Sequence, residues 1–149
     1  MKIEIDQSEK IERTNKDTVI AFSNKISGSL LIRAEDKRKI QDIFREIGKP
    51  NIFVYHLFAI LIFLLIKEHL KKINQIVIDE EYPGKQRLIK SFLMKEIKKV
   101  QPDFLAEDIS FYRIGKKSKA HDIAYGVSSN QQSADKVIGV KEELKFLVK

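Results

Sequence analysis

The fold that we expect for this chain is decided by residues 75–82, which read QIVIDEEY. Residues 76–78 form a short, wholly apolar run, which is typical of a strand buried on both faces in the middle of an α/β sheet. The run stops at three consecutive carboxylates, residues 79–81, and Pro83-Gly84 breaks the chain directly after them. A core strand therefore carries acids to the rim of a sheet, which is where open α/β sheets bind ligands.

The segments around this strand predict the rest of an α/β fold. Alternating and β-branched patterns predict further strands over residues 2–6, 18–23, 30–32 and 109–114. Apolar residues at helical spacing predict helices over residues 35–47, 51–72, 86–100 and 120–127. The first three strands have short connections, which favours an antiparallel meander, whereas each later strand follows a helix and pairs in parallel. We expect a single domain, residues 1–149, with a mixed sheet of about five strands and helices on both faces; the tail from residue 136 is not assigned.

Residues 52–66 are almost wholly apolar, interrupted only by Tyr55 and His56. A membrane span needs about 20 apolar residues, and this run is shorter and is followed by charged residues. We expect a central helix buried against the sheet, with His56 as a satisfied polar group, and no stable membrane insertion; the alternative is a membrane anchor. Because the helix is apolar all round, it needs cover on more than one side, and a homo-oligomer formed through Ile52–Ile66 is one source of that cover.

The overall composition is that of a globular protein with a basic surface. The chain has 149 residues, of which 43% are hydrophobic and 33% charged, and its net charge is +7. A basic surface suits a nucleic-acid partner, although a lysine-rich protein without a polyanion partner has the same charge. The absence of cysteine excludes disulfides and cysteine-based zinc sites. The first residues form a charged strand pattern, not a signal peptide, so we expect a cytoplasmic location.

Three acids occupy comparable places in the predicted elements. Asp6 ends the first strand, Asp79 ends the buried strand, and Asp122 lies at the start of the last helix. If the fold brings them together, they form a cluster of like charges that is costly unless a cation neutralises it. Hard oxygen ligands favour Mg²⁺ or Mn²⁺. Each acid also has a purely structural explanation, as a solvated strand end or as a favourable charge in a first helical turn.

The element order, with acids after the first strand, after the fourth strand and in the last helix, resembles the ribonuclease H-like superfamily. This superfamily includes ribonucleases H, retroviral integrases, transposases and Holliday-junction resolvases. The chain is most similar to an uncharacterised branch that has Asp-Glu-Ser-Gly after its first strand and a Ser-Lys pair before a Gln-x-Ala-Asp-x-x-Ala-Gly helix. The corresponding pieces here are IDQS (5–8), IVID (76–79) and SKAHDIAYG (118–126). This chain departs from the pattern at Gln7, which replaces an acid, at Glu9, which replaces glycine, and at His121, which replaces a small residue.

The resemblance implies a metal-dependent nuclease, or a related phosphodiester hydrolase, that acts on DNA or RNA. Asp6, Asp79 and Asp122 would hold two Mg²⁺ or Mn²⁺ ions about 3.5–4 Å apart. One ion would activate a water molecule and the other would stabilise the leaving oxygen. Glu80 or Glu81 would be a fourth ligand, unless both are solvated turn charges.

The basic loop before the last helix is the candidate for phosphate binding, through Lys116, Lys117 and Lys119; an ordinary solvated turn is the alternative. His121, next to the third acid, is a candidate for proton transfer or metal binding, or else a surface histidine. Two other function classes fit the sequence. One is a catalytically inactive ribonuclease H-like module that binds nucleic acid or a partner protein. The other is an oligomeric scaffold, or a weakly membrane-associated protein, that uses the helix containing residues 52–66.

Overall fold

The structure is a computed structural model that describes residues 1–115 and 117–147. Its described strands form one mixed sheet in the order β5-β4-β1-β2-β3-β6. The strands are β1 (Lys2–Ser8), β2 (Thr18–Ser23), β3 (Ser27–Ile32), β4 (Gln75–Asp79), β5 (Ile109–Tyr112) and β6 (Lys136–Ile138). The α-helices are α1 (Ala34–Glu46), α2 (Phe53–Ile66), α3 (Gln86–Val100), α4 (Lys119–Ser128) and α5 (Val140–Leu147). Single 3₁₀ segments lie at Pro50–Ile52, Lys67–Lys72 and Ala106–Asp108.

The pairing of the strands follows from their connections. β1, β2 and β3 are joined by short loops and pair antiparallel, as the sequence predicts. β4 and β5 each follow a helix; β4 pairs in parallel with β1, and β5 pairs in parallel with β4. The carboxyl ends of β1, β4 and β5 therefore lie side by side, where these strands leave the sheet.

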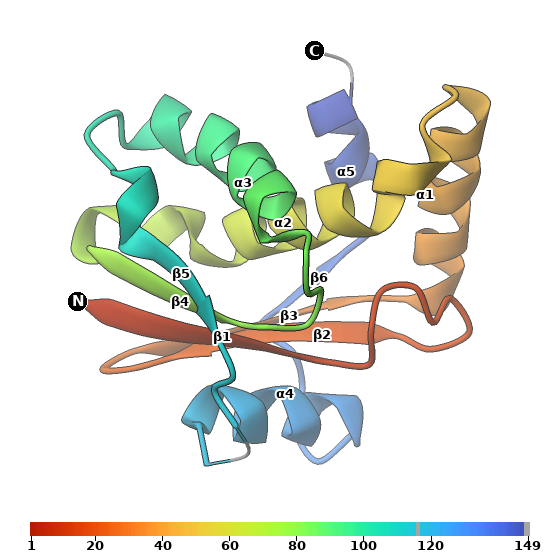
Figure 1. Cartoon of the computed structure of the whole chain (residues 1–149). Coiled ribbons are helices and arrows are strands. Elements are labelled where there is room, and N and C mark those ends of the chain that lie inside the picture. Colours follow the sequence, from red (N-terminus) through yellow and green to blue (C-terminus); the bar gives the residue numbers. More distant parts are fainter. Residues whose placement is uncertain (116, 148–149) are drawn as a thin grey trace.

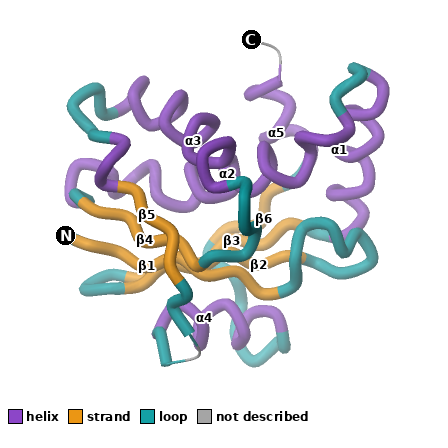
Figure 2. The backbone as a smooth tube through the Cα atoms, in the orientation of Figure 1, coloured by secondary structure: helices purple, strands orange, loops and turns teal. Residues whose placement is uncertain are grey.

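The helices cover the two faces of the sheet unequally. Figure 1 shows α1, α2, α3 and α5 above the sheet and α4 alone below it, and the tube in Figure 2 shows the same layers. The expected α/β class, with helices on both faces of a mixed sheet, is therefore confirmed. The main core lies between the sheet and the four upper helices, whereas α4 packs on a smaller cluster that includes Val19, Ala21 and Ala124.

Helix α2 is the centre of the main core. Its residues from Leu57 to Ile66 are all buried, and it contacts β2 and β3 on one side and α1, α3 and α5 on the other. The segment Pro50–Lys72 is long and apolar enough to cross a membrane by length and composition, but 61% of its most apolar window is buried within the fold. The cover that an all-round apolar helix needs is thus supplied, over Leu57–Ile66, by this chain's own elements.

The tail contains elements that the sequence did not assign. Residues 136–138 form β6, which pairs in parallel with β3 and extends the sheet from the expected five strands to six. α5 follows and packs against α1 and α2. Other boundaries also differ. β1 continues to Ser8 rather than residue 6, β3 begins at Ser27 rather than residue 30, and β5 ends at Tyr112 rather than residue 114. The single helix predicted over residues 51–72 is α2 flanked by 3₁₀ turns.

Candidate functional site

Two of the predicted acids lie side by side at the shared edge of the parallel strands. Ile5 of β1 is in register with Ile78 of β4, so Asp6 and Asp79 directly follow paired residues. Residues in register on neighbouring strands point to the same face, and the strands are about 4.8 Å apart. The backbone N–H of Gln7 donates a hydrogen bond to Asp6 Oδ1 (2.8 Å), and the N–H of Ile114 donates one to Asp79 Oδ1 (2.8 Å). The convergence of Asp6 and Asp79 is therefore confirmed.

The third acid of the cluster is Glu81. One carboxylate oxygen from each of Asp6, Asp79 and Glu81 lies within 4.8 Å of the others, which makes this the group suited to a metal ion among the described residues. Two oxygens on the same Mg²⁺ lie at most about 4.2 Å apart, because each Mg–O bond is about 2.1 Å long. The three carboxylates thus stand close to the spacing that one hard cation requires. They line a hollow of about 320 Å³.

The electrostatics of this group show how strongly its charges interact. Burial raises the pKa of Asp6 to about 6, and the charge of Asp79 adds to the rise, against hydrogen bonds from Gln7 and His121. Burial likewise raises the pKa of Glu81 to about 8, with a further rise from its hydrogen bond to Asp79 and the charges of Asp79 and Asp6, and a decrease from Lys10. Without a cation Glu81 therefore retains its proton near neutral pH, because the carboxyl is partly buried and lies beside the charges of Asp79 and Asp6.

Asp122 does not belong to the group, and the prediction that it would is wrong. Its side chain is exposed on α4, outside the residues that line the hollow. Successive residues of an α-helix are rotated by about 100°. His121 is the residue that faces the strands, since its Nδ1 lies 3.0 Å from Asp6 Oδ2, and this orientation turns the next residue away. α4 therefore contributes an imidazole to the site instead of a carboxylate.

His121 is held beside the acids by the start of α4. The ring is partly exposed, at 34%, and it contacts the most buried acid of the cluster. α4 is held by Ser118, whose Oγ accepts the N–H of Ala120 at the start of the helix and donates to Glu4 Oε1 on β1. The helix start is thus tied to the strand that carries Asp6, so that the imidazole and the acid are held together.

Of the two glutamates that the sequence offered as a fourth ligand, Glu81 lies with the other acids and Glu80 does not. Glu80 lines the hollow, but its Oε1 accepts a hydrogen bond from Gln86 Nε2 (2.7 Å) and it is outside the group of three. Glu81, one residue further, is half-buried and not a solvated turn charge. A strand fixes alternating directions only up to its last residue, and β4 ends at Asp79, so residue type and spacing could not decide which glutamate turns inward.

The two described lysines of the basic loop are not among the residues that line the acidic hollow. Lys117 and Lys119 line a second hollow of about 440 Å³, together with Lys2, Glu4 and Asn24, over the face of the sheet beside α4. Lys116 lies outside the described residues. The cation that lines the acidic hollow is Arg113, directly after β5.

Sequence reasoning named Glu81 only as one of two candidates for a fourth ligand, and it missed Arg113 and Gln7 as lining residues of the hollow. Arg113 had a local signal, because it follows a predicted parallel strand at the same rim. Gln7 had one as well, since it stands where the resembling branch has an acid. Comparison with protein families, curated proteins and solved structures finds no match to this chain.

Proposed function

We propose that this protein is a divalent-metal-dependent hydrolase of phosphodiester bonds in nucleic acid. The observation that supports it best is the convergence of Asp6, Asp79 and Glu81 at the carboxyl ends of parallel strands, with oxygens within 4.8 Å of one another. A divalent cation stabilises this arrangement, because it replaces the protons that the raised pKa values of Asp6 and Glu81 retain. The ions expected from such hard oxygen ligands are Mg²⁺ and Mn²⁺.

The arrangement of the sheet supports a ribonuclease H-like assignment for this domain. The resemblance implies a three-strand antiparallel meander with two parallel strands beside it, and the order β3-β2-β1-β4-β5 has that form. Its acids belong at the ends of the first and fourth strands; Asp79 is the last residue of β4, and Asp6 lies two residues before the end of β1. His121 comes from the helix that the resemblance expects to carry the third acid. Strand β6, at the far edge, is an addition to this plan.

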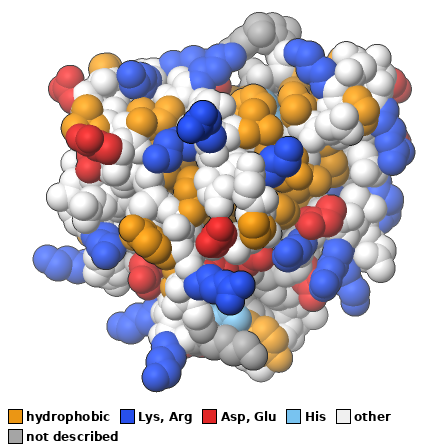
Figure 3. Space-filling model, viewed as in Figure 1, with side chains coloured by type: hydrophobic (Ala, Val, Ile, Leu, Met, Phe, Trp, Pro, Cys, Tyr) orange, Lys and Arg blue, Asp and Glu red, His pale blue; other side chains and the backbone are white. Residues whose placement is uncertain are grey.

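A surface track from the acids supports a polymeric substrate. The acidic hollow shares Arg113 with a neighbouring hollow, which in turn shares Lys2 and Glu4 with the hollow that contains Lys117 and Lys119. From Asp6 to Lys2 the track follows β1 for about 13 Å. In Figure 3 acidic side chains gather in the band above α4, and Lys and Arg side chains lie on the surface around them. Phosphates held by these cations would bring a neighbouring phosphodiester to the metal.

In the proposed reaction Asp6, Asp79 and Glu81 would hold the divalent ion, which would supply Lewis-acid activation of the phosphodiester and of the attacking water. Arg113, which lines the same hollow, would contact the substrate phosphate. His121, hydrogen-bonded to Asp6, transfers the proton between the reacting oxygen and solvent.

The test is cleavage of labelled single- and double-stranded DNA and RNA by the purified chain in millimolar Mn²⁺. We expect hydrolysis that EDTA abolishes and that Asp79→Asn reduces to background, because the substituted amide would keep the hydrogen bond from Ile114 but lose the charge that binds the ion. Asp103→Asn, at an exposed residue far along the chain, is the matched control and should cleave normally.

Hydrolysis that persists in EDTA, or in Asp79→Asn, would contradict the proposal. Nucleic-acid binding without hydrolysis in any metal, unaffected by Asp79→Asn, would instead identify an inactive binding module. Nucleic-acid binding along the surface track past Arg113, Lys2, Lys117 and Lys119 should weaken with added salt, because this binding releases counterions from the phosphates.

A further inference from the structure

The face of the sheet on which α4 packs is covered over β1, β2 and β3, whereas its β4–β5 side lies beyond the helix. Side chains alternate along a strand, and Ile76, Ile78 and Ile109 point into the main core. The residues between them therefore point to the α4 side; they are Gln75, Val77 and Asp79 on β4 and Ser110 and Tyr112 on β5. Four of these five, all except Asp79, line a hollow of about 380 Å³, which we call the β4–β5 hollow.

Tyr112 lies in this hollow next to the acids. It is in register with Asp79, so the two side chains point to the same face from strands about 4.8 Å apart. Tyr112 is 63% exposed and lines the β4–β5 hollow. Within the described part of the chain, no other aromatic ring packs against it. A flat aromatic surface is therefore open to a ligand beside the carboxylates.

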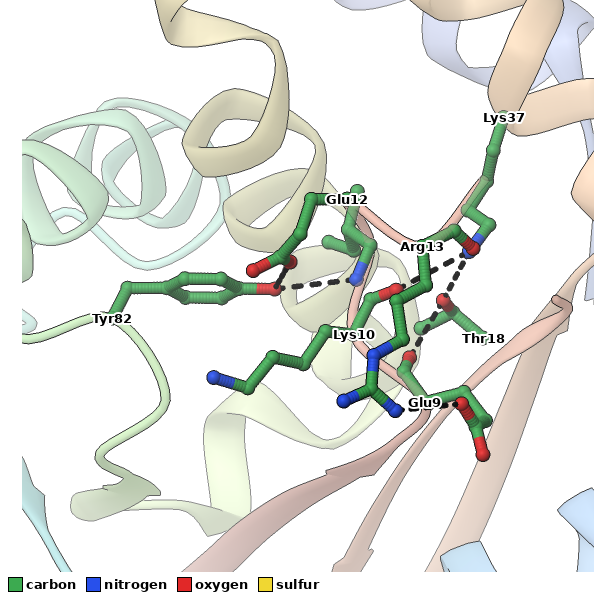
Figure 4. A network of polar contacts seen from close by, with 8 residues as sticks. Glu9, Lys10, Glu12, Arg13, Thr18, Lys37 and Tyr82 are labelled. Atoms are coloured by element: carbon green, nitrogen blue, oxygen red, sulfur yellow. Dashed lines mark hydrogen bonds and ion pairs between the residues drawn. The ribbon is translucent and has the colours of Figure 1, made fainter. Parts of the chain in front are cut away.

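The other tyrosine near the acids, Tyr82, is not open in this way. It directly follows Glu81 but is only 8% exposed. Its hydroxyl receives the N–H of Ile11 (3.3 Å) and donates to Glu12 Oε1 (3.1 Å), both in the loop between β1 and β2 that Figure 4 shows. Lys10 lies over the ring, 5.8 Å from its centre. Tyr82 is thus fixed in the fold, and Tyr112 is the tyrosine that a substrate can reach.

The middle and far end of the β4–β5 hollow suit a nucleobase better than a phosphate. Val77 and Ser110, in register on neighbouring strands, supply uncharged surface. Glu107 and Asp108, directly before β5, add two carboxylates. Carboxylates repel phosphates, but they accept hydrogen bonds from the amino groups of bases. The hollow therefore combines an open ring with acceptors for the edge of a base.

Cations lie where this hollow joins its neighbours. Arg113 also lines the acidic hollow, and Lys2 also lines the hollow that contains Lys117 and Lys119. Glu4, the acid shared with that last hollow, accepts a hydrogen bond from the start of α4. A nucleic-acid backbone can thus meet positive charge on either side of a base held in the β4–β5 hollow.

We propose that the β4–β5 hollow binds an unpaired nucleobase that stacks on Tyr112, and that the substrate is therefore single-stranded nucleic acid. Inside a duplex the neighbouring base pairs cover both faces of each base, so only an unstacked base presents a face to the ring. The phosphate next to that base would contact Arg113, at the border of the acidic hollow. This inference rests on the proposed hydrolase and names the form of its substrate.

The test is fluorescence anisotropy of a labelled single-stranded oligodeoxythymidylate with the purified full chain in EDTA, so that binding is measured without metal or cleavage. We expect Tyr112→Ala to weaken binding about tenfold, because the stacking of one base is lost. Tyr112→Trp should bind at least as tightly as the parent chain. Tyr125→Ala, at a tyrosine of α4 that is 57% exposed and outside the hollow, is the matched control and should leave the affinity unchanged.

Two further readouts separate stacking from support of the fold. An abasic oligonucleotide of the same length should bind the parent chain and Tyr112→Ala equally, because it has no base to stack. Tyr112→Ala should weaken binding of the intact oligonucleotide by the same factor at every salt concentration, whereas Lys117→Ala should reduce the salt dependence itself. A Tyr112 that only supported the sheet would lower the melting temperature and weaken the binding of both oligonucleotides alike.

The outcomes distinguish this inference from the function on which it rests. Equal affinity of the parent chain and Tyr112→Ala for the oligonucleotide, or tighter binding of a duplex, would overturn the base-binding hollow and leave metal-dependent hydrolysis untouched. If Tyr112→Ala weakens binding but the parent chain hydrolyses nothing in Mn²⁺, only the hydrolase is overturned. A dimer in gel filtration that Tyr112→Ala dissociates would show that a second copy covers this face, and would overturn the inference.

Discussion

At the scale of single residues, the site depends on which neighbours in the chain turn inward. Asp6 and Asp79 were predictable, because a strand that ends in an acid delivers that acid to the rim whatever the rest of the chain does. The choice of Glu81 over Glu80, and of His121 over Asp122, was not predictable. Each choice depends on a rotation of the backbone that only packing against another element determines.

The crowding of these carboxylates predicts how a substitution alters stability. In the absence of metal, Asp79→Asn should raise the free energy of unfolding by about 1–2 kcal/mol near pH 8, because it removes the like charge that raises the pKa of Asp6 and of Glu81. The same change should weaken Mn²⁺ binding. Urea unfolding in EDTA measures the first effect and calorimetry the second.

The pH dependence of this gain has a definite sign. The folded pKa values of Asp6 (about 6) and Glu81 (about 8) lie above the ordinary values of 3.8 and 4.5, so the folded state holds more protons than the unfolded state between these limits. The stabilisation that the metal-free parent chain gains from these bound protons is thus fully present below about pH 4. It is lost as the pH rises through about 6 and then about 8. The advantage of Asp79→Asn should accordingly be small at pH 4 and grow with pH; an advantage that does not change with pH would contradict the account.

At the scale of elements, α5 shows how a charge can anchor a helix in the core. Its sequence, VKEELKFL, has three acidic or basic residues in the first four after Val140, and periodicity does not say which of them is buried. The structure buries Glu143 completely, with Oε1 2.7 Å from Nδ1 of His56 on α2. His56 is thus the satisfied polar group that we expected within a buried helix. Burial raises the pKa of Glu143, and the bond and charge of His56 oppose the rise.

This contact predicts that α5 depends on Glu143. Glu143→Ala should lower the free energy of unfolding by about 2–4 kcal/mol, because it leaves the largely buried ring of His56 without its partner and opens space beneath the helix. Urea unfolding measures the loss, and hydrogen exchange of the α5 amides should accelerate. Glu46→Ala, at an exposed glutamate of α1, is the control and should change stability by less than about 0.5 kcal/mol. Unchanged α5 exchange in Glu143→Ala would show that apolar packing alone holds the helix.

At the scale of the whole molecule, the fold is arranged around α2. The helix is apolar on all sides because the sheet covers one side and α1, α3 and α5 cover the others. The sequence predicted a buried helix from the length of the apolar run, but it did not show which elements supply the cover. One of those elements, α5, comes from the tail of the chain and reaches α2 only in the folded structure.

Because α2 lies at the centre of the core, shortening one of its buried side chains should lower the folding stability substantially. Leu61 is completely buried in the middle of the helix, so Leu61→Ala should cost about 2–5 kcal/mol of folding free energy. Leu105→Ala, at a leucine that is 52% exposed, is the matched control and should cost far less. For each variant, the loss of folding free energy should be the same with and without a mild detergent. A Leu61→Ala chain that loses little stability in water but more in detergent would mean that α2 is buried in lipid and not in this core.

Local polarity patterns were enough to locate most of the helices and strands and the antiparallel meander, because each of these depends on residues close together in the chain. The rim where Asp6 and Asp79 meet depends instead on the parallel pairing of two distant strands. Only the tertiary structure decided that Glu81 completes the acids and that His121 faces Asp6. It also decided that β6 joins β3 and that Glu143 reaches His56. These contacts join segments as much as 115 residues apart, and their directions follow from packing rather than from the order of residue types.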